Sequence, residues 1–296
     1  MPATSAPLQR LRLTLDMIKF EHSVFALPFA TVGALLAWRG VGGQVTGLAA
    51  KFGWILLAMV SARSAAMAFN RLLDRQIDAR NPRTAGRHLP AGLLQTSFVW
   101  SFFAATIALF LLASAMLNSL CLRLSPVALL VILGYSFTKR FTSLSHLVLG
   151  LALGIAPMAA GIALTDRIDW RLCALTVAVM CWTAGFDIIY ACQDYEFDRA
   201  AGLHSIPVRL GLPGALRVSR LLHGLMLACL IWLWRAYGLD GAALAGIGIT
   251  AALLLYEHSL VKPNDFSRVD AAFFTVNGWV SVIFGLCWMV DIIWLS

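Results

Sequence analysis

The sequence predicts an all-α polytopic membrane protein. Hydrophobic residues make up 60% of the 296 residues and charged residues only 13%, whereas soluble domains average about 45–50% and about 25%. The mean hydropathy is +0.79, which leaves too few polar side chains to cover a soluble globule of this size. Apolar runs of about 20 residues, the length that crosses a bilayer as a helix, recur along the chain. The same composition excludes a disordered, collagen-like or coiled-coil chain.

Nine apolar runs cover most of the chain, and each is expected to form one transmembrane helix. The first run is the shortest, and Pro28 within it is expected to bend the helix, which neighbouring helices can accommodate. Gly and Pro residues separate several of the later runs, where turns are expected. The expected spans are residues 22–38, 48–69, 96–117, 119–136, 145–163, 170–190, 215–236, 241–260 and 271–295.

The distribution of basic residues sets the orientation. With a cytoplasmic N-terminus, sixteen of the 23 Lys and Arg residues fall on the cytoplasmic side and six on the opposite side, while Arg63 lies inside the second span. Cytoplasmic loops carry such an excess, so the N-terminus is expected to be cytoplasmic. The net charge of +8 has the same origin, and no nucleic-acid partner is expected. The six scattered Cys residues show no spacing typical of a metal site or a disulfide framework.

Two pairs of carboxylates stand out among only 15 acidic residues. Asp74 and Asp78 follow the second span, and Asp194 and Asp198 follow the sixth. A spacing of four residues places each pair on one face of a helix, one turn apart. Because the second and sixth spans both run towards the cytoplasm, the two pairs are expected at the same end of the bundle.

Further polar residues accompany these pairs. Asn70 lies one turn before the first pair, and Asp187 and Tyr190 precede the second. Tyr135 and Lys139, four residues apart, end the fourth span on the same side. Successive helical hairpins are therefore expected to bring polar groups to one central cavity on the cytoplasmic side.

Four clustered carboxylates at a membrane interface favour a bound divalent cation. Like charges four residues apart on a helix repel, and poorly hydrated acids in a membrane usually mark function. Mg²⁺ takes oxygen ligands, commonly one or two carboxylates together with phosphate and water. The expected site therefore holds two Mg²⁺ ions bridged by a diphosphate. The alternative is that these aspartates are solvated charges paired with Arg71, Arg75 and Arg199.

Basic residues on the same side are candidates for phosphate contacts. Arg binds phosphate oxygens through a two-pronged fork, whereas Lys acts as a point charge. Arg63, two turns before Asn70 inside the second span, is instead the candidate for binding a substrate carboxylate. The candidates for phosphate are Arg71, Arg83, Arg87, Lys139, Arg140 and Arg209.

Several segments resemble the motifs of the UbiA superfamily of intramembrane aromatic prenyltransferases, most closely those of its 4-hydroxybenzoate polyprenyltransferase branch. The main matches are NRLLDRQID, YSFTK and DIIYACQDYEFD, with further matches at 19–30, 78–92 and 201–211. The resemblance covers nearly the whole chain. It departs at Arg71, where many relatives carry Asp.

The resemblance implies nine transmembrane helices around a central cavity capped by the loops that follow the second and sixth spans. It also implies the metal ligands. One Mg²⁺ would be bound by Asn70, Asp74 and Asp78, and the other by Asp194 and Asp198.

The expected catalytic residues follow from the same match. Tyr135 and Lys139 are expected near the diphosphate, and Asp187 and Tyr190 are expected to face the substrate, so these four are the expected catalytic residues. The residues expected to bind substrate are Arg63, Arg71, Arg83 and Arg87.

The implied reaction is the Mg²⁺-dependent transfer of a polyprenyl group from polyprenyl diphosphate to the ring of an aromatic acid. The expected acceptor is 4-hydroxybenzoate, in ubiquinone biosynthesis, and the alternative is a dihydroxynaphthoate-type acid, in menaquinone biosynthesis by the futalosine route. A membrane transporter is the alternative of a different class, because intramembrane acids also mark ion pathways.

The expected organisation is one domain over residues 1–296 with two pseudo-repeated halves, about 20–140 and 141–296. The expected location is the cell inner membrane, which the chain crosses several times, with the active site facing the cytoplasm. The length of the prenyl chain and the oligomeric state are left open.

Overall fold

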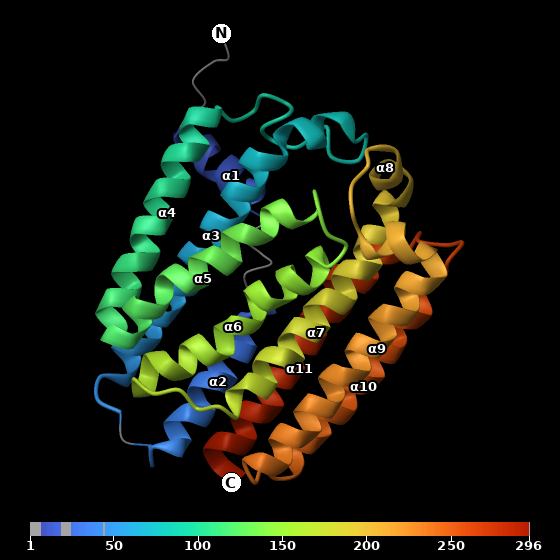
Figure 1. Cartoon of the computed structure of the whole chain (residues 1–296). Coiled ribbons are helices and arrows are strands. Elements are labelled where there is room, and N and C mark those ends of the chain that lie inside the picture. Colours follow the sequence, from blue (N-terminus) through green and yellow to red (C-terminus); the bar gives the residue numbers. More distant parts are fainter. Residues whose placement is uncertain (1–6, 19–24, 44, 296) are drawn as a thin grey trace.

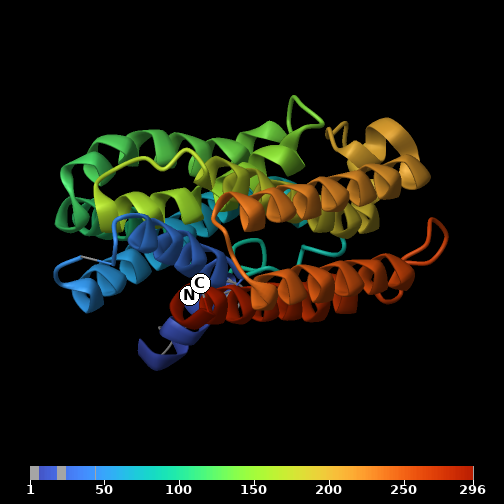
Figure 2. The ribbon, with the colours of Figure 1, turned by 90° about the horizontal axis from the view of Figure 1, so that it is seen from below.

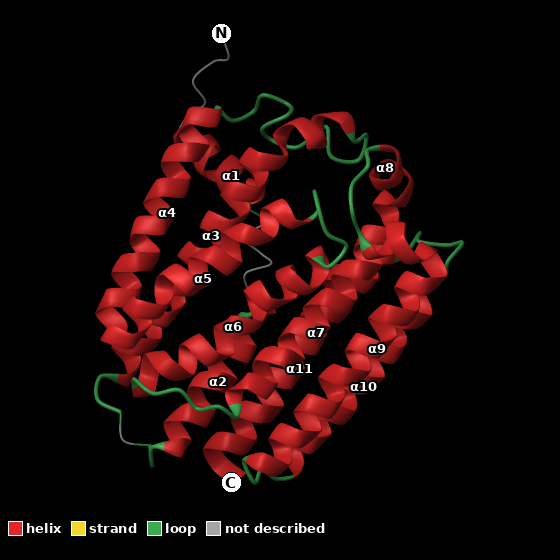
Figure 3. Cartoon of the chain, in the orientation of Figure 1, coloured by secondary structure: helices red, strands yellow, loops and turns green. Residues whose placement is uncertain are grey.

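The computed structural model describes residues 7–18, 25–43 and 45–295, which form a bundle of long helices lying side by side (Figure 1). Over these ranges, eight helical segments are long and apolar enough to cross a membrane, and no strand is drawn among them (Figure 3). Turns of π-helix at Ala271–Val276 and Asp291–Leu295 flank the last long helix. The long helices are α3 (Leu48–Arg80), α4 (Thr96–Leu117), α5 (Ser119–Thr138), α6 (Ser145–Thr165), α7 (Leu172–Ala191), α9 (Ile206–Ala236), α10 (Gly241–Leu260) and α11 (Asn277–Val290).

The prediction of an all-α membrane protein is confirmed, and most span boundaries agree within a few residues. The predicted first span, 22–38, corresponds to α2 (Leu27–Gly40), which has only 14 residues; residues 22–24 lie outside the described ranges. Nine transmembrane helices and a cytoplasmic N-terminus therefore stay predictions.

Pro28 does not bend α2, contrary to the sequence-based expectation. It is the second residue of that helix, where the first N–H groups have no intrahelical acceptor in any case. Its fixed φ angle suits this first turn, so Pro28 begins the helix.

Small residues bring α2, α6 and α7 into close contact. A Cβ atom on Gly33 would collide with the carbonyl oxygen of Pro157, and one on Gly150 would collide with that of Met180. In membrane bundles, glycine at such crossings allows helix backbones to approach closely. Helix α6 is therefore packed tightly between α2 and α7.

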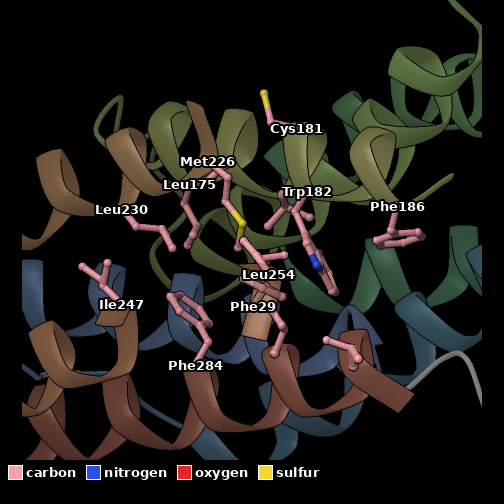
Figure 4. Packing of buried hydrophobic residues seen from close by; sticks show 14 of the residues in the cluster. Phe29, Leu175, Cys181, Trp182, Phe186, Met226, Leu230, Ile247, Leu254 and Phe284 are labelled. Carbon is pink, nitrogen blue, oxygen red and sulfur yellow. The ribbon is translucent and has the colours of Figure 1, made fainter. Parts of the chain in front are cut away.

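Aromatic rings fill the core between α2, α7 and α11 (Figure 4). The ring centroid of Phe29 lies 4.9 Å from that of Trp182 and 4.5 Å from that of Phe284. All three side chains are fully buried. This packing fixes α7, the helix that leads to the second aspartate pair.

A buried polar network also connects the C-terminal helices. The indole Nε1 of Trp182 donates to Asn277 Oδ1 at 2.6 Å, and Asn277 Nδ2 donates to Glu257 Oε1 at 3.1 Å. His223 Nδ1 lies 3.0 Å from His258 Nε2. Helices α7, α9, α10 and α11 are thus joined by hydrogen bonds between largely buried side chains.

The polar loops gather at one end of the bundle. The end of α3, the loop 81–95, the loop 139–144 and α8 (Tyr195–Ala200) lie there, whereas η4 (Asp291–Leu295) lies at the other end (Figures 1 and 2). Helix α3 continues as a helix to Arg80 and so carries the first aspartate pair away from the apolar run. This arrangement puts the two aspartate pairs on the same end, as expected.

One helix was not expected from the sequence. Helix α1 (Pro7–Met17) is short, and Met17 packs with Leu89, Leu94 and Val99. The N-terminal segment therefore lies against the loop 81–95 beside the polar end of the bundle.

Candidate active site

The second aspartate pair lies on two helical pieces rather than on one continuous helix. Helix α7 ends at Ala191, a 3₁₀ turn follows at Cys192–Asp194, and α8 begins at Tyr195. The expectation that Asp194 and Asp198 share one regular helix face is therefore wrong in detail. Contacts from the facing loop hold Asp194, and such tertiary contacts can override the local preference for a regular helix.

Asp194 is held by two side chains of the loop 81–95. Arg83 binds it in a fork, with Nε 2.8 Å from Oδ1 and Nη2 2.5 Å from Oδ2, and Asn81 Nδ2 donates to Oδ1 at 3.0 Å. Arg83 Nη1 also donates to the hydroxyl of Tyr190 at 3.2 Å. Burial alone would lower the pKa of Arg83, but the hydrogen bond and ion pair with Asp194 raise it. Arg83 therefore links the two predicted aspartate-bearing segments.

Asp198 is fully buried and pairs with the end of α5. Lys139 Nζ lies 2.8 Å from Asp198 Oδ1, while Oδ2 has no hydrogen-bond partner among the described residues. The backbone N–H of His204 donates to the carbonyl of Lys139 at 2.8 Å. The loop after α8 is thus tied to the loop 139–144.

The first aspartate pair has the same kind of partners. Asn70 Nδ2 donates to Asp74 Oδ2 at 2.8 Å, and Arg140 Nη2 lies 3.3 Å from Asp74 Oδ1. Arg87 Nη1 lies 2.6 Å from Asp78 Oδ1, and Asp78 Oδ2 is buried with no hydrogen-bond partner in the described part of the chain. Both predicted carboxylates therefore lie at the polar end, each with a cation beside it.

Each of the four aspartates is thus paired with a different cation from the loops. Asp78, Asp194 and Asp198 are only 5%, 8% and 0% exposed, so they are not the solvated charges of the alternative interpretation. Arg75, a partner in that alternative, donates instead to Thr96 at 2.9 Å.

The remaining basic candidates divide between the site and other parts of the structure. Arg71 interacts electrostatically with both Asp74 and Asp78, so it lies among the carboxylates. Arg209 donates to the hydroxyl of Ser143 at 3.3 Å and has no carboxylate partner among the described residues. Arg71, Arg83, Arg87, Lys139 and Arg140 are therefore brought together, and Arg209 holds a loop.

An apolar cavity of about 350 Å³ lies between α3, α4, α5 and α6. Arg63 and Tyr135 are among the residues that line it, and Arg63 alone of the described lining residues is charged. The Nε atom of Arg63 is buried without a hydrogen-bond partner in the described structure. Tyr135 interacts electrostatically with Arg63 and Arg71 as well as with Asp74 and Asp187, so it lies where the cavity meets the carboxylates.

Two residues of this region escaped the sequence analysis. Asn81 holds Asp194, although an Asn-Pro dipeptide only indicates a turn. His146, the second residue of α6, has Nδ1 2.7 Å from Asp187 Oδ2. A lone histidine that opens an apolar span has no spacing that predicts a role, so neither residue could be singled out.

The donor set fits magnesium ions that a substrate helps to hold. No group of three or more His, Cys, Asp or Glu side chains in the described ranges is arranged to hold a metal ion by itself. The site instead offers carboxylate and amide oxygens from two facing segments, and Oδ2 of Asp78 and Oδ2 of Asp198 are buried with no hydrogen-bond partner among the described residues. Mg²⁺ commonly takes only one or two carboxylates per ion and fills its other positions with phosphate and water.

Fold and site together define an integral membrane protein with a carboxylate-rich polar site above an apolar cavity. A model of the UbiA prenyltransferase family matches residues 26–281. The chain therefore belongs to the UbiA prenyltransferase family and is an enzyme of the prenyltransferase class, as the sequence motifs indicated.

Curated relatives agree with this assignment. The chain is 31% identical over 226 residues to the 4-hydroxybenzoate octaprenyltransferase of Aliivibrio fischeri (strain MJ11), covering 75% of this chain and 77% of that protein. It is 29% identical over 279 residues to the 4-hydroxybenzoate octaprenyltransferase of Burkholderia pseudomallei (strain 668), covering 92% of this chain and 94% of that protein.

Solved structures show the same fold. A UbiA homolog from Aeropyrum pernix K1 superimposes with a TM-score of 0.82 and 36% identity, over 92% of this chain and 98% of that one. A UbiA homolog from Archaeoglobus fulgidus, bound to GPP and Mg²⁺, gives a TM-score of 0.69 at 21% identity, over 95% of this chain and 99% of that one.

Proposed function

We propose that this enzyme transfers a polyprenyl group from polyprenyl diphosphate to the ring of 4-hydroxybenzoate, in a reaction that depends on Mg²⁺. One observation carries the proposal: two aspartate pairs, each aspartate beside its own cation, lie at one end of an apolar cavity in which Arg63 is the one charged side chain among the described lining residues. The polar end suits a diphosphate, the apolar walls suit an isoprenoid chain, and the arginine suits a carboxylate. The names of the curated relatives support the same acceptor.

In this proposal the aspartates hold the metal ions. Asn70, Asp74 and Asp78 would hold one Mg²⁺, and Asp194 and Asp198 would hold the other. When bound, Mg²⁺ supplies a Lewis acid that stabilises negative charge on the departing diphosphate.

The cations provide further contacts for the diphosphate. Lys139, Arg83, Arg87 and Arg140 lie 2.5–3.3 Å from aspartate oxygens, and each has donors left over for phosphate oxygens. Charge-assisted hydrogen bonds from such groups are about twice as strong as neutral ones. Arg71, whose charge interacts with those of Asp74 and Asp78, would add a further positive charge near the diphosphate.

The cavity would bind the aromatic acid and the first part of the prenyl chain. Arg63 would bind the carboxylate through a charge-assisted hydrogen bond from its guanidinium group. Tyr135, between this arginine and the aspartates, would orient the ring towards the diphosphate end. The apolar walls would exclude water from the reactive carbon.

The chemistry is then an exchange of bonds at one carbon. The bond between C1 of the prenyl group and the diphosphate oxygen breaks, and the ring carbon ortho to the hydroxyl group bonds to C1. Asp187, beside Tyr190 on the last turn of α7, would accept the proton that the ring carbon loses, which restores aromaticity. Tyr190 would hold Arg83 in place through the hydrogen bond of 3.2 Å between them.

A dihydroxynaphthoate-type acid is the second candidate acceptor, because it presents the same carboxylate to Arg63 with a larger ring system. Transport is not proposed, because the chain belongs to a family of prenyltransferases. We further propose that the enzyme resides in the cell inner membrane with its site facing the cytoplasm, which is supported by the excess of Lys and Arg near the polar end.

The acceptor is tested by product analysis. Purified enzyme is incubated with geranyl diphosphate, Mg²⁺ and equal concentrations of two acceptors, 4-hydroxybenzoate and a 1,4-dihydroxynaphthoate. The proposal expects mainly geranylated 4-hydroxybenzoate by mass spectrometry. If the naphthoate product predominates, the acceptor is a dihydroxynaphthoate-type acid instead of 4-hydroxybenzoate, and the proposed reaction class is unchanged.

A further inference from the structure

A buried histidine with no assigned role lies directly against Asp187. The Nδ1 atom of His146 is 2.7 Å from Asp187 Oδ2, and the His146 side chain is only 5% exposed. Its Nε2 atom is buried and has no hydrogen-bond partner among the described residues. Asp187 is more open, with 23% of its side chain exposed, so its second oxygen can meet a ligand.

The pair lies close to residues that line the apolar cavity. Leu149 and Leu153, one and two turns further along α6 than His146, line the cavity, and residues three and seven apart share a helix face. Asp187 interacts electrostatically with Tyr135, which also lines the cavity. A ring bound beside Tyr135 would therefore lie close to Asp187.

The hydrogen-bonding pattern defines the form of the imidazole. A carboxylate only accepts hydrogen bonds, so the 2.7 Å contact requires the proton on Nδ1. His146 is therefore the hydrogen-bond donor to Asp187.

We propose that His146 is a positioning residue that aims Asp187 at the acceptor ring; this inference rests on the proposed function. By donating to Oδ2, His146 fixes the carboxylate so that Oδ1 accepts the ring proton. Before this proton transfer, the bond between C1 and the diphosphate oxygen has broken and the bond between the ring carbon and C1 has formed. The ring C–H bond then breaks, its electron pair returns to the ring, and the proton resides on Asp187 until water takes it.

The test separates positioning from packing. His146→Leu removes the donor and keeps an apolar filling, whereas His146→Asn keeps an N–H donor near the position of Nδ1. We expect kcat to fall about 10- to 100-fold in His146→Leu, the effect of losing one hydrogen bond to a charged group, with KM for both substrates within about twofold. In His146→Asn, kcat should stay within about threefold of the wild type.

A double variant shows whether His146 acts through Asp187. In an Asp187→Asn background, His146→Leu should lower kcat no further, because residues that act as one unit are not additive. His223→Leu is the matched control: it removes another buried histidine, in the network between α7, α9 and α10, and should leave kcat unchanged even where the melting temperature falls.

The outcomes are distinct. A kcat of His146→Leu within twofold of the wild type, an equal loss in His146→Asn, or a further loss in the double variant would each overturn the role of His146. If His146→Leu does not fold, His146→Ala takes its place with the same expectations. Failure of the wild-type enzyme to prenylate any aromatic acid would instead refute the proposed function.

Discussion

Arg63, the arginine that lines the cavity, provides the most specific prediction about substrate binding. Arg63 is the charged residue among the described cavity-lining residues, and its Nε lacks a hydrogen-bond partner there. In Arg63→Ala the acceptor carboxylate would lose a charged hydrogen bond, which is worth about 1.5–3 kcal/mol, or about 10- to 150-fold in affinity. We expect KM for 4-hydroxybenzoate to rise by that factor while kcat and KM for geranyl diphosphate change little, the pattern of a contact made equally in the ground and transition states.

The assay measures initial rates with geranyl diphosphate at saturation and 4-hydroxybenzoate varied, and then with 4-hydroxybenzyl alcohol as an acceptor without the carboxylate. Arg63→Ala should lose most of the wild-type preference for the acid. Arg75→Ala is the control, because Arg75 lies on the same helix but is exposed and donates to Thr96. A rise in KM for geranyl diphosphate, with the preference for the acid kept, would show that Arg63 binds the diphosphate instead.

Three further predictions concern the metal site, stability and topology. Asp194→Asn should abolish turnover with every acceptor, because it removes a charged ligand and leaves Arg83 without its carboxylate; measurable turnover at saturating Mg²⁺ would contradict this role. Asn277→Leu should lower the free energy of unfolding by about 1–3 kcal/mol for each buried partner left without a hydrogen bond, here Trp182 and Glu257. Single cysteines placed in the loops 81–95 and 201–205 of a cysteine-free variant should react with an impermeant reagent from the same side of the membrane.

The first two of these predictions have matched controls. Glu196→Gln changes a neighbouring carboxylate that has no proposed ligand role and should keep turnover. Ser259→Ala removes an exposed hydroxyl contact to the Tyr256 carbonyl and should leave the free energy of unfolding nearly unchanged. Labelling of the two loops from opposite sides of the membrane would separate the aspartate pairs and refute the shared site.

The long helices could be predicted because each apolar run has a length that the bilayer dictates. The ends of α4 and α10 agree with the expected spans to the residue. The shared end of the two aspartate pairs could also be predicted, because alternating spans return every second loop to the same side. The two pseudo-repeated halves stay a prediction.

Details that depend on tertiary contacts could not be predicted. The 3₁₀ turn at Cys192–Asp194 coincides with the fork from Arg83, and a spacing of four residues cannot reveal such a break. The one-to-one pairing of aspartates and cations depends on how two loops fold over each other. Single polar residues such as His146 and Asn277 interrupt apolar runs without any period, so their partners emerge only when the helices pack.

The central claim is that the two aspartate pairs together activate a prenyl diphosphate for transfer to an aromatic acid. It is tested most directly by mass spectrometry of the product formed from geranyl diphosphate and 4-hydroxybenzoate by purified wild-type enzyme, Asp74→Asn and Asp198→Asn, each with Mg²⁺ or EDTA. The account predicts geranylated 4-hydroxybenzoate from the wild-type enzyme with Mg²⁺, and no product with EDTA or from either variant. Equal product from the wild type and either variant, or full activity in EDTA, would contradict it.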